Sequence, residues 1–181
     1  MLSRKAKYGL KAMLRLATEQ GAGPMLVATL ADAETIPKKF LEQILLELKH
    51  HGLLQSKKGK GGGYMLARPA SEISIGEVIR TLDGPIALIP CVSQTAYVKC
   101  DECQDETTCG IRIVMKEVRD AMVSILDGRS LADVGRAVAA VGATPPRGGS
   151  HAAPLGVRGA ARVKSWDVTL PFPARPRRAR E

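Results

Sequence analysis

The four cysteines of the chain all lie between positions 91 and 109, and their type and spacing are what most clearly predict chemistry. Cys100 and Cys103 form a Cys-x2-Cys pair, five residues separate Cys103 from Cys109, and eleven separate Cys91 from Cys103. Thiolates at such spacing in a loop suit an iron–sulfur cluster or tetrahedral zinc. The sequence therefore predicts a metal site made of Cys91, Cys100, Cys103 and Cys109, and the spacing leaves iron–sulfur and zinc both open.

Two other interpretations of these cysteines remain. They could form a thiol–disulfide switch without metal, or their clustering could be incidental. Four acidic side chains lie beside the thiols and would disfavour reduction of a bound centre: Asp101, Glu102, Asp105 and Glu106.

The segments before the cysteines have the pattern of a nucleic-acid-binding domain. Apolar spacing predicts helices over residues 3–20, with Ser3 as the cap, and over residues 25–33. A turn ending at Pro37 precedes a third helix to His51, which carries polar residues near its start. Two helices joined by a tight turn predict a helix-turn-helix whose second helix enters the major groove.

A β-hairpin is predicted directly after the third helix. Residues 53–57 and 64–67 read as strands, and the tip between them is rich in Lys and Gly. Glycines there allow positive φ and a close approach to phosphate, and the lysines neutralise charge. A nucleotide-binding loop is the rival interpretation, but the tip lacks the Gly-Lys-Ser/Thr ending. A hairpin in this position is a wing, so we expect DNA contacts from Arg4, Lys5, Lys7, Lys38, Lys39, Glu42, Gln43, Lys57, Lys58, Lys60, Gly61, Gly62, Gly63 and Tyr64.

The charge is distributed as a DNA-binding protein requires. The net charge is +9; residues 1–60 carry 11 Lys or Arg against 5 Asp or Glu, and residues 143–181 carry 8 against 2. This asymmetry is typical of proteins that bind phosphate backbones. No apolar run reaches the roughly 20 residues of a membrane span and no signal-peptide core is present, so we expect a cytoplasmic protein without a membrane partner. Clustered cysteines in that reducing compartment favour metal binding or redox sensing.

The remaining segments predict a dimer and a tail. A capping box at Ser74 starts a short helix to Leu82, and Ser130 starts a last helix to about Val141. Residues 111–126 form one long helix with a wide apolar stripe, which predicts pairing with a second copy. The expected fold is mostly α with one small β-hairpin: a winged helix-turn-helix domain (1–85), a cysteine loop with a dimerisation helix (86–141) and a disordered basic tail (142–181).

Several motifs in this order resemble the Rrf-two family of bacterial transcription regulators, which includes the regulator of iron–sulfur assembly and the nitric-oxide-sensing repressor. The resemblance covers roughly residues 1–135. It implies a dimeric winged-helix protein and, in some branches, an iron–sulfur centre that adjusts DNA affinity. The motifs are Ser3-x-Lys5-x-x-Tyr8-x-Leu10-x-Ala12-Met13, Leu41-Glu-Gln43-Ile-Leu, Gly59-x-Gly61-Gly-Gly-Tyr64, Ile75-Gly-Glu-Val78-Ile and Val118-Arg-Asp-Ala121.

The cysteines depart from the pattern of that family. Its cluster-binding branches usually carry three cysteines, each pair separated by five residues, and only Cys103 and Cys109 keep that interval here. The outside ligands of those branches are also absent: Arg112 stands where one branch has a His, and the first helix has no acidic residue before Glu19. Four thiolates therefore fit better than three thiolates plus an outside ligand.

The expected function is that of a homodimeric transcription regulator that binds double-stranded operator DNA. It would sense iron, redox or nitrosative state through a Cys-ligated iron–sulfur cluster, either [2Fe–2S] or [4Fe–4S], with zinc as the alternative. A cofactor-free family regulator that binds a metabolic enzyme is one rival. An iron–sulfur electron carrier is another, but a wing has no use in a carrier. No nucleophile and base pair is recognisable and the histidines are scattered, so we expect no enzyme.

Overall fold

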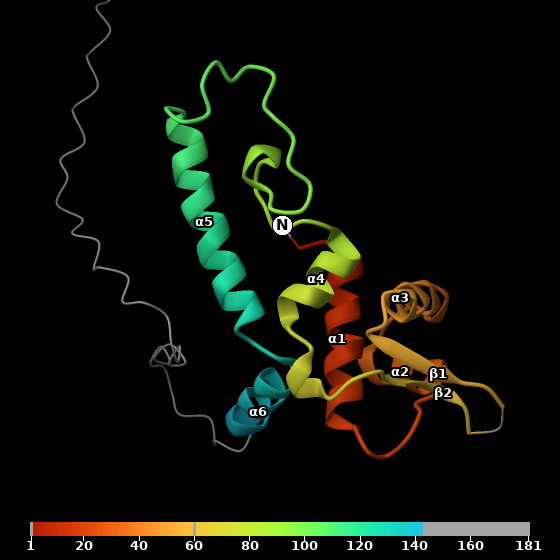
Figure 1. The fold of residues 1–181 in the computed structure, drawn as a ribbon. Coiled ribbons are helices and arrows are strands. Elements are labelled where there is room, and N and C mark those ends of the chain that lie inside the picture. The colour runs from red at the N-terminus through yellow and green to blue at the C-terminus, as the bar shows by residue number, and fades with distance from the viewer. Residues whose placement is uncertain (1, 60, 143–181) are drawn as a thin grey trace, which may run out of the picture. The chain divides into compact units, whose positions relative to one another are not determined.

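The computed structural model of the chain describes residues 2–59 and 61–142 (Figure 1). These residues form helices and one β-hairpin, so the predicted fold class is confirmed. In chain order the elements are α1 (Arg4–Thr18), α2 (Val27–Glu34), α3 (Lys38–His50), β1 (Leu54–Lys57), β2 (Gly63–Leu66), a 3-10 turn η1 (Ala70–Glu72), α4 (Ile75–Asp83), a second 3-10 turn η2 (Pro90–Val92), α5 (Gly110–Asp127) and α6 (Leu131–Gly142).

The helix α1 is central to the packing, since it contacts α2, α3, α4, α6 and β2. Ser3 begins it as predicted: the Ser3 hydroxyl accepts a hydrogen bond from the Ala6 N–H at 3.0 Å, which satisfies one of the free donors of the first turn. The largest fully buried side chains, which come from α1 and from other elements, define the hydrophobic core. They are Met13, Leu30, Leu41, Ile44, Leu45, Leu48, Leu53, Ile73, Val78 and Leu131.

The helix-turn-helix consists of α2 and α3. Thr35, in the left-handed conformation with φ of 55°, ends α2, and Pro37 precedes the first turn of α3. Phe40 of α3 is half-buried, with its ring edge-on to Tyr8 at 5.9 Å between centroids. The start of α2 was predicted two residues too early, because the backbone of Met25 pairs with Tyr64 instead of entering the helix.

The wing is the antiparallel hairpin of β1 and β2, with Leu54 opposite Leu66 and Lys57 opposite Gly63. Three glycines around the tip, at positions 59, 61 and 63, have the positive φ that the sequence predicted. Met25 and Tyr64 exchange both backbone hydrogen bonds at 2.9 Å, which forms an isolated β-bridge beside the two-stranded hairpin. The wing is thereby fixed to the segment that enters α2.

The helices α4, α5 and α6 are fixed to one another at their ends. Ser74 caps α4 as predicted, but Glu77 pairs with Arg68 at 2.6 Å rather than completing a capping box. At the other end of α5, Asp127 accepts a hydrogen bond from Arg80 of α4 at 2.7 Å. Backbone bonds between residues 73–75 and 129–131 complete this junction.

The long helix α5 has two different faces. Arg119 is buried, and the residues that follow it at helical spacing on the same side, Met122 and Leu126, are half-buried. Ile111, Val114 and Ile125 lie along another side and are 68%, 51% and 55% exposed. The wide stripe seen in the sequence therefore divides into an inner face and an exposed apolar face.

The predicted tail lies, apart from Gly142, outside the described residues, and the predicted domain boundaries stay a prediction. Across the residues that are described, none of the helices combines the length and apolar character needed to cross a bilayer.

Replacing Gly63 with Ala tests how the wing is held. A Cβ there would lie 2.1 Å from the Met25 carbonyl oxygen, a backbone atom, and φ is +150°. We expect the free energy of unfolding in urea to fall by about 2–4 kcal/mol, from overpacking and backbone strain together. Gly59→Ala is the matched control, since its φ of +93° is strained but its Cβ would meet open space. It should cost about 1–2 kcal/mol, and equal losses would contradict the role of the Met25 contact.

Candidate functional site

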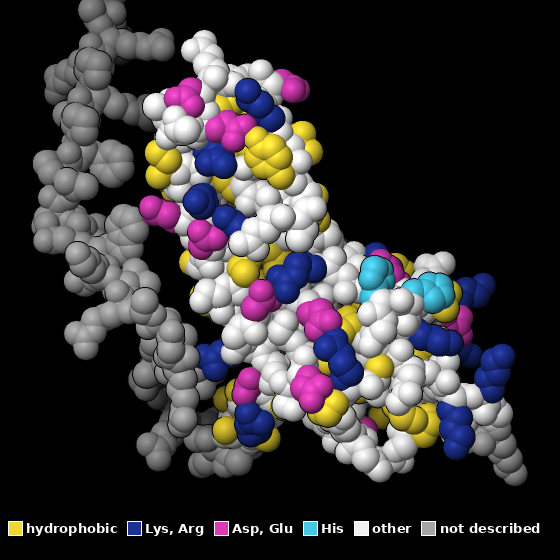
Figure 2. Space-filling model, in the orientation of Figure 1, with side chains coloured by type: hydrophobic (Ala, Val, Ile, Leu, Met, Phe, Trp, Pro, Cys, Tyr) yellow, Lys and Arg dark blue, Asp and Glu magenta, His cyan; other side chains and the backbone are white. Residues whose placement is uncertain are grey.

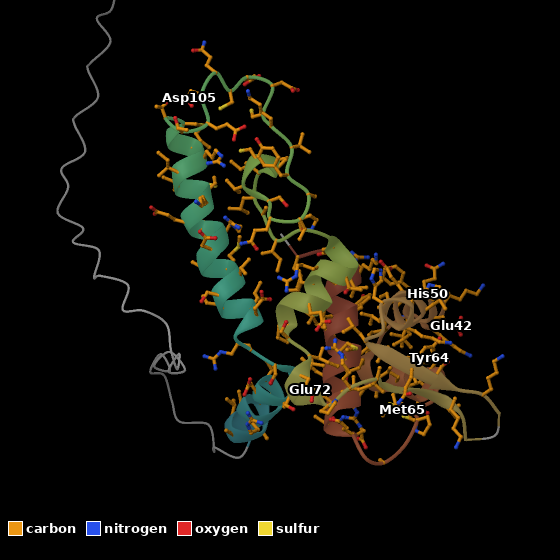
Figure 3. The ribbon with its side chains drawn as sticks, in the orientation of Figure 1. Glu42, His50, Tyr64, Met65, Glu72 and Asp105 are labelled. Carbon is orange, nitrogen blue, oxygen red and sulfur yellow. The ribbon has the colours of Figure 1, made fainter. Side chains whose placement is uncertain are left out.

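The exposed side of α3 carries the residues that sequence reasoning assigned to base contacts. Lys38, Lys39, Glu42 and Gln43 are all exposed, and Figure 3 shows Glu42 on the outer side of the helix. The opposite side of α3 is buried in the core. Because residues three and four apart share a helix face, Lys39 and Gln43 lie in one row. That row continues to Leu46, which is 45% exposed and was not foreseen as part of the surface.

The basic residues of α1 divide into two groups. Arg4 and Lys7 are exposed and available to phosphate. The ammonium group of Lys5 lies 2.8 Å from the Glu47 carboxylate on α3, and each side chain is about one-third exposed. Lys5 therefore connects the first turn of α1 to α3. The sequence did not indicate this contact.

The wing supplies further basic groups. Lys57 and Lys58 are exposed, and Figure 2 shows Lys and Arg side chains in dark blue around the wing and α3. Lys60 lies outside the described residues. Gly61 is exposed, whereas a Cβ on Gly62 would collide with the Lys57 carbonyl oxygen at 2.3 Å. The glycines at positions 61, 62 and 63 thus let the tip fold tightly enough to present the lysines.

Tyr64 has a structural role in addition to its predicted one. Its backbone is paired with Met25, and its half-buried ring packs against the hydrophobic core. Figure 3 labels this residue on the hairpin, where it pairs with Ser56, one position from the tip-side pair of Lys57 and Gly63.

All four cysteines line a single pocket of about 580 Å³ between the 3-10 turn η2 and the start of α5. Cys91 is buried in η2, Cys103 and Cys109 are half-buried, and Cys100 is exposed; all four are free thiols. The chain folds the pocket from segments on both sides of the loop, and its walls are mostly apolar. Besides the cysteines the lining consists of Ile89, Pro90, Val98, Lys99, Asp101, Glu102 and Ile111.

The thiols influence one another inside this pocket. Partial burial, together with the neighbouring Cys109 sulfur, raises the pKa of the Cys103 thiol above its ordinary value. The protonated form is therefore favoured, and binding of a metal cation would have to release this proton. Among the described residues, no three His, Cys, Asp or Glu side chains are grouped closely enough to hold one ion. The thiols share a pocket without converging on one point.

The acidic residues of the loop have separate roles. Asp101 and Glu102 line the pocket, as their position in the sequence suggested. Asp105, at the end of the loop near α5 in Figure 3, accepts hydrogen bonds from Thr107 and Thr108, and these donors lower the pKa of its carboxyl group. It is thus engaged in a local turn rather than directed at the thiols.

Glu106 is held by two partners that sequence reasoning missed. The Tyr97 hydroxyl donates a hydrogen bond to one carboxylate oxygen of Glu106, and this bond raises the pKa of the phenol. Arg112 of α5 lies 3.5 Å from the other oxygen. A sequence signal for these contacts is lacking, because the three residues follow no helical or strand period.

The donor set of the pocket fits an iron–sulfur cluster. Its four cysteine sulfurs are soft donors, its walls are largely apolar, and thiolates are the ligands that such clusters require. A centre with several metal atoms can join sulfurs that do not surround one point, whereas a single tetrahedral zinc needs all four within about 2.3 Å of itself.

Comparison with known proteins identifies the class of regulator. An rrf2-like HTH-type transcriptional regulator of Rhodobacter capsulatus is 42% identical over 137 residues, which cover 74% of this chain and 91% of that protein. CymR (YrzC), the global cysteine regulator of B. subtilis, has a solved structure that matches with a TM-score of 0.64 at 31% identity, covering 76% of this chain and 97% of that one. IscR of T. potens matches with a TM-score of 0.63 at 27% identity, covering 81% and 93%.

The family model described as Rrf2, iron-dependent transcriptional regulator, matches residues 2–137. That range includes the helix-turn-helix, the wing, the cysteine loop and α5. The resemblance noted in the sequence is confirmed, and the chain belongs to the Rrf2 family of HTH-type, DNA-binding transcriptional regulators and is not an enzyme.

Proposed function

We propose that this regulator is a homodimer that adjusts its grip on operator DNA through an iron–sulfur cluster held by Cys91, Cys100, Cys103 and Cys109. The observation that carries the proposal is the gathering of all four thiols in one apolar-walled pocket. When bound, a cluster would supply a centre sensitive to iron supply, oxidation and nitric oxide. Because the DNA of a bacterium lies in its cytoplasm, we expect the protein to act there.

The cysteine loop is connected to the helix α3 through hydrogen bonds and an ion pair. The loop begins after Asp83, the last residue of α4, and Asp83 accepts hydrogen bonds from the backbone N–H of Ser3, at 2.8 Å, and from its hydroxyl. Ser3 begins α1, and Lys5 in the first turn of α1 pairs with Glu47 on α3. Ordering of the loop by ligation can thus act on both α3 and α5. A tenfold change in the affinity for DNA requires a coupling free energy between ligation and DNA binding of only about 1.4 kcal/mol.

The exposed face of α5 supports a homodimer. Ile111, Val114 and Ile125 are all at least half exposed on one side of an 18-residue helix. Exposed apolar rows of this kind mark interaction sites, and major-groove readers commonly pair by a two-fold axis that matches their operator. A second copy of α5 is therefore the occupant we propose for this face.

The contacts with DNA follow from the exposed residues of α3, α1 and the wing. Glu42 can accept a hydrogen bond from a cytosine amino group, and Gln43 can bridge an adenine. Lys38 and Lys39 would contact base edges or nearby phosphates. Arg4, Lys7, Lys57 and Lys58 would hold the backbone, with Lys60 and the glycines at positions 61 to 63 at the tip.

A regulator without a metal is the second candidate. It is supported by the separation of the thiols in the described residues and by the likeness to the solved structure of CymR. In that case the cysteines would act as thiols, and the anaerobically purified protein would contain neither iron nor zinc. Zinc in the same pocket would give a colourless protein with one metal and no sulfide.

Replacing Cys103 with Ala tests the ligand set. Anaerobically purified protein should show visible absorption from sulfur-to-iron charge transfer, and Cys103→Ala should abolish it, because Cys103 lies between the other two loop thiols. Thr108→Ala is a control from the same loop that removes no sulfur. An unchanged spectrum in the Cys103 variant would exclude this residue from the site.

Separate variants distinguish base contacts from phosphate contacts. Gln43→Ala should weaken operator binding by about 1–3 kcal/mol and leave binding to unrelated DNA unchanged, as loss of a base contact would. Lys58→Ala should weaken both and reduce the slope of log K against log salt by about 1. Fluorescence anisotropy over a salt series measures both effects, with Lys116→Ala on α5 as the control. Identical behaviour of the two variants would contradict the assigned contacts.

A charge on the exposed face of α5 should separate the protomers. We expect Val114→Glu to shift the protein from dimer to monomer in sedimentation equilibrium, because a carboxylate would be buried without a partner. Lys116→Glu, an exposed neighbour on the same helix, should remain dimeric. A dimer that tolerates Glu at position 114 would place the interface elsewhere.

A further inference from the structure

We propose that Tyr97, Glu106 and Arg112 form a clasp that holds the cysteine loop closed over its thiols. The three are positioning residues: they touch one another and not a bound group. Their consequence for a cluster depends on the function proposed above, but their effect on the thiols themselves does not. A clasp of this kind would decide how accessible Cys103 and Cys109 are in the metal-free protein.

The first contact of the clasp closes the loop across its two arms. Tyr97 lies in the arm that leaves η2, and Glu106, nine positions further along the chain, lies in the arm that returns to α5. The segment between them contains Cys100 and Cys103. A hydrogen bond from the Tyr97 hydroxyl to Glu106 therefore restricts the part of the loop that carries the Cys-x2-Cys pair.

The second contact attaches the closed loop to a rigid helix. Arg112 lies in the first turn of α5, and its Nε is 3.5 Å from Glu106. Both side chains are mostly buried, with 29% of Arg112 and 23% of Glu106 exposed. The Nε atom has no hydrogen-bond partner among the described residues, so the attraction to Glu106 is ionic rather than an aligned hydrogen bond.

The polar contacts of Asp105 differ from the clasp in their range. Among the described residues, Asp105 accepts hydrogen bonds from Thr107 and Thr108, which are two and three residues away. Those bonds fold a local turn but join neither arm to the other. Cys91 is buried in η2 and lies outside the segment between Tyr97 and Glu106 that the clasp closes.

Alkylation rates of the individual cysteines test the clasp in the absence of metal. The chelator-treated, reduced protein is pulsed with iodoacetamide, and each cysteine is quantified by peptide mass spectrometry. Tyr97→Phe, which loses only the hydroxyl, should raise the rate at Cys103 about three- to tenfold, as loss of one hydrogen bond allows. The rate at Cys91 should not change. Tyr8→Phe, which removes a hydroxyl far from the loop, is the matched control.

Arg112→Gln separates the clasp from simple electrostatics. Removing a positive charge three residues beyond Cys109 would by itself favour the protonated form of the thiols and slow alkylation. Opening of the clasp predicts the opposite, a faster reaction at Cys103. In the double variant of Arg112→Gln and Tyr97→Phe, the alkylation rate at Cys103 should not exceed that of the faster single variant, because both substitutions open the same clasp.

Three results would overturn the proposal. They are an unchanged rate at Cys103 in Tyr97→Phe, a slower rate in Arg112→Gln, and a rate that rises equally at Cys91, which would indicate general unfolding.

Release of iron to a chelator from loaded protein should also be faster in Tyr97→Phe than in wild type. If the wild-type protein holds no metal, the proposed cluster fails, while the alkylation rates still decide the clasp.

Discussion

The arrangement of this protein depends on one constraint: the segment between α4 and α5 contains only the short 3-10 turn η2, yet it places four thiols in one pocket, so the helices at its ends have to fix it. One end is fixed at Asp83, which bonds to Ser3 at the start of α1. The other end is fixed by α5, whose last turn is joined to α4 through Asp127 and Arg80. The loop therefore connects two elements that are already in contact, and its closure costs less chain entropy than a free loop of the same length.

The helix α1 connects the base of the cysteine loop to the elements that would bind DNA. The same helix contacts α3 and the wing strand β2, and it also contacts α4, after which the cysteine loop begins. Its first turn carries Arg4 and Lys7 into solvent, while Lys5 is held by Glu47. A displacement at the base of the loop would reach the phosphate contacts and the reader helix through that one turn. If the exposed apolar face of α5 pairs with a second copy, the same displacement would also reach that copy through α5.

Much of this fold could be predicted because its signals are local. A capping residue such as Ser3 acts within one turn, and the glycines of the wing tip satisfy backbone conformations at their own positions. The same locality explains the correct prediction of α5, whose 3.6-residue period is visible in the sequence. Which residues of that stripe face inward, however, depends on packing against other elements, so the exposed row of Ile111, Val114 and Ile125 emerged only with the structure.

The remaining differences have a common physical origin in contacts between distant residues. Met25 was assigned to a helix, but its backbone pairs with Tyr64. Glu77 was expected to complete its cap, but Arg68 pairs with it across the intervening turn. For the candidate site, the four cysteines were recognisable by type, whereas the bonds of Glu106 to Tyr97 and Arg112 follow no period that a sequence could reveal.

The central claim is that a metal centre in the cysteine pocket sets the affinity for DNA. Its most direct test is the dissociation constant for one operator fragment, measured anaerobically on the same wild-type preparation before and after iron is removed, with iron, sulfide and zinc quantified in each sample. We expect iron and sulfide in the first sample and an affinity change of about tenfold or more on their removal. Protein that contains no metal and binds the operator equally well under both conditions would contradict it.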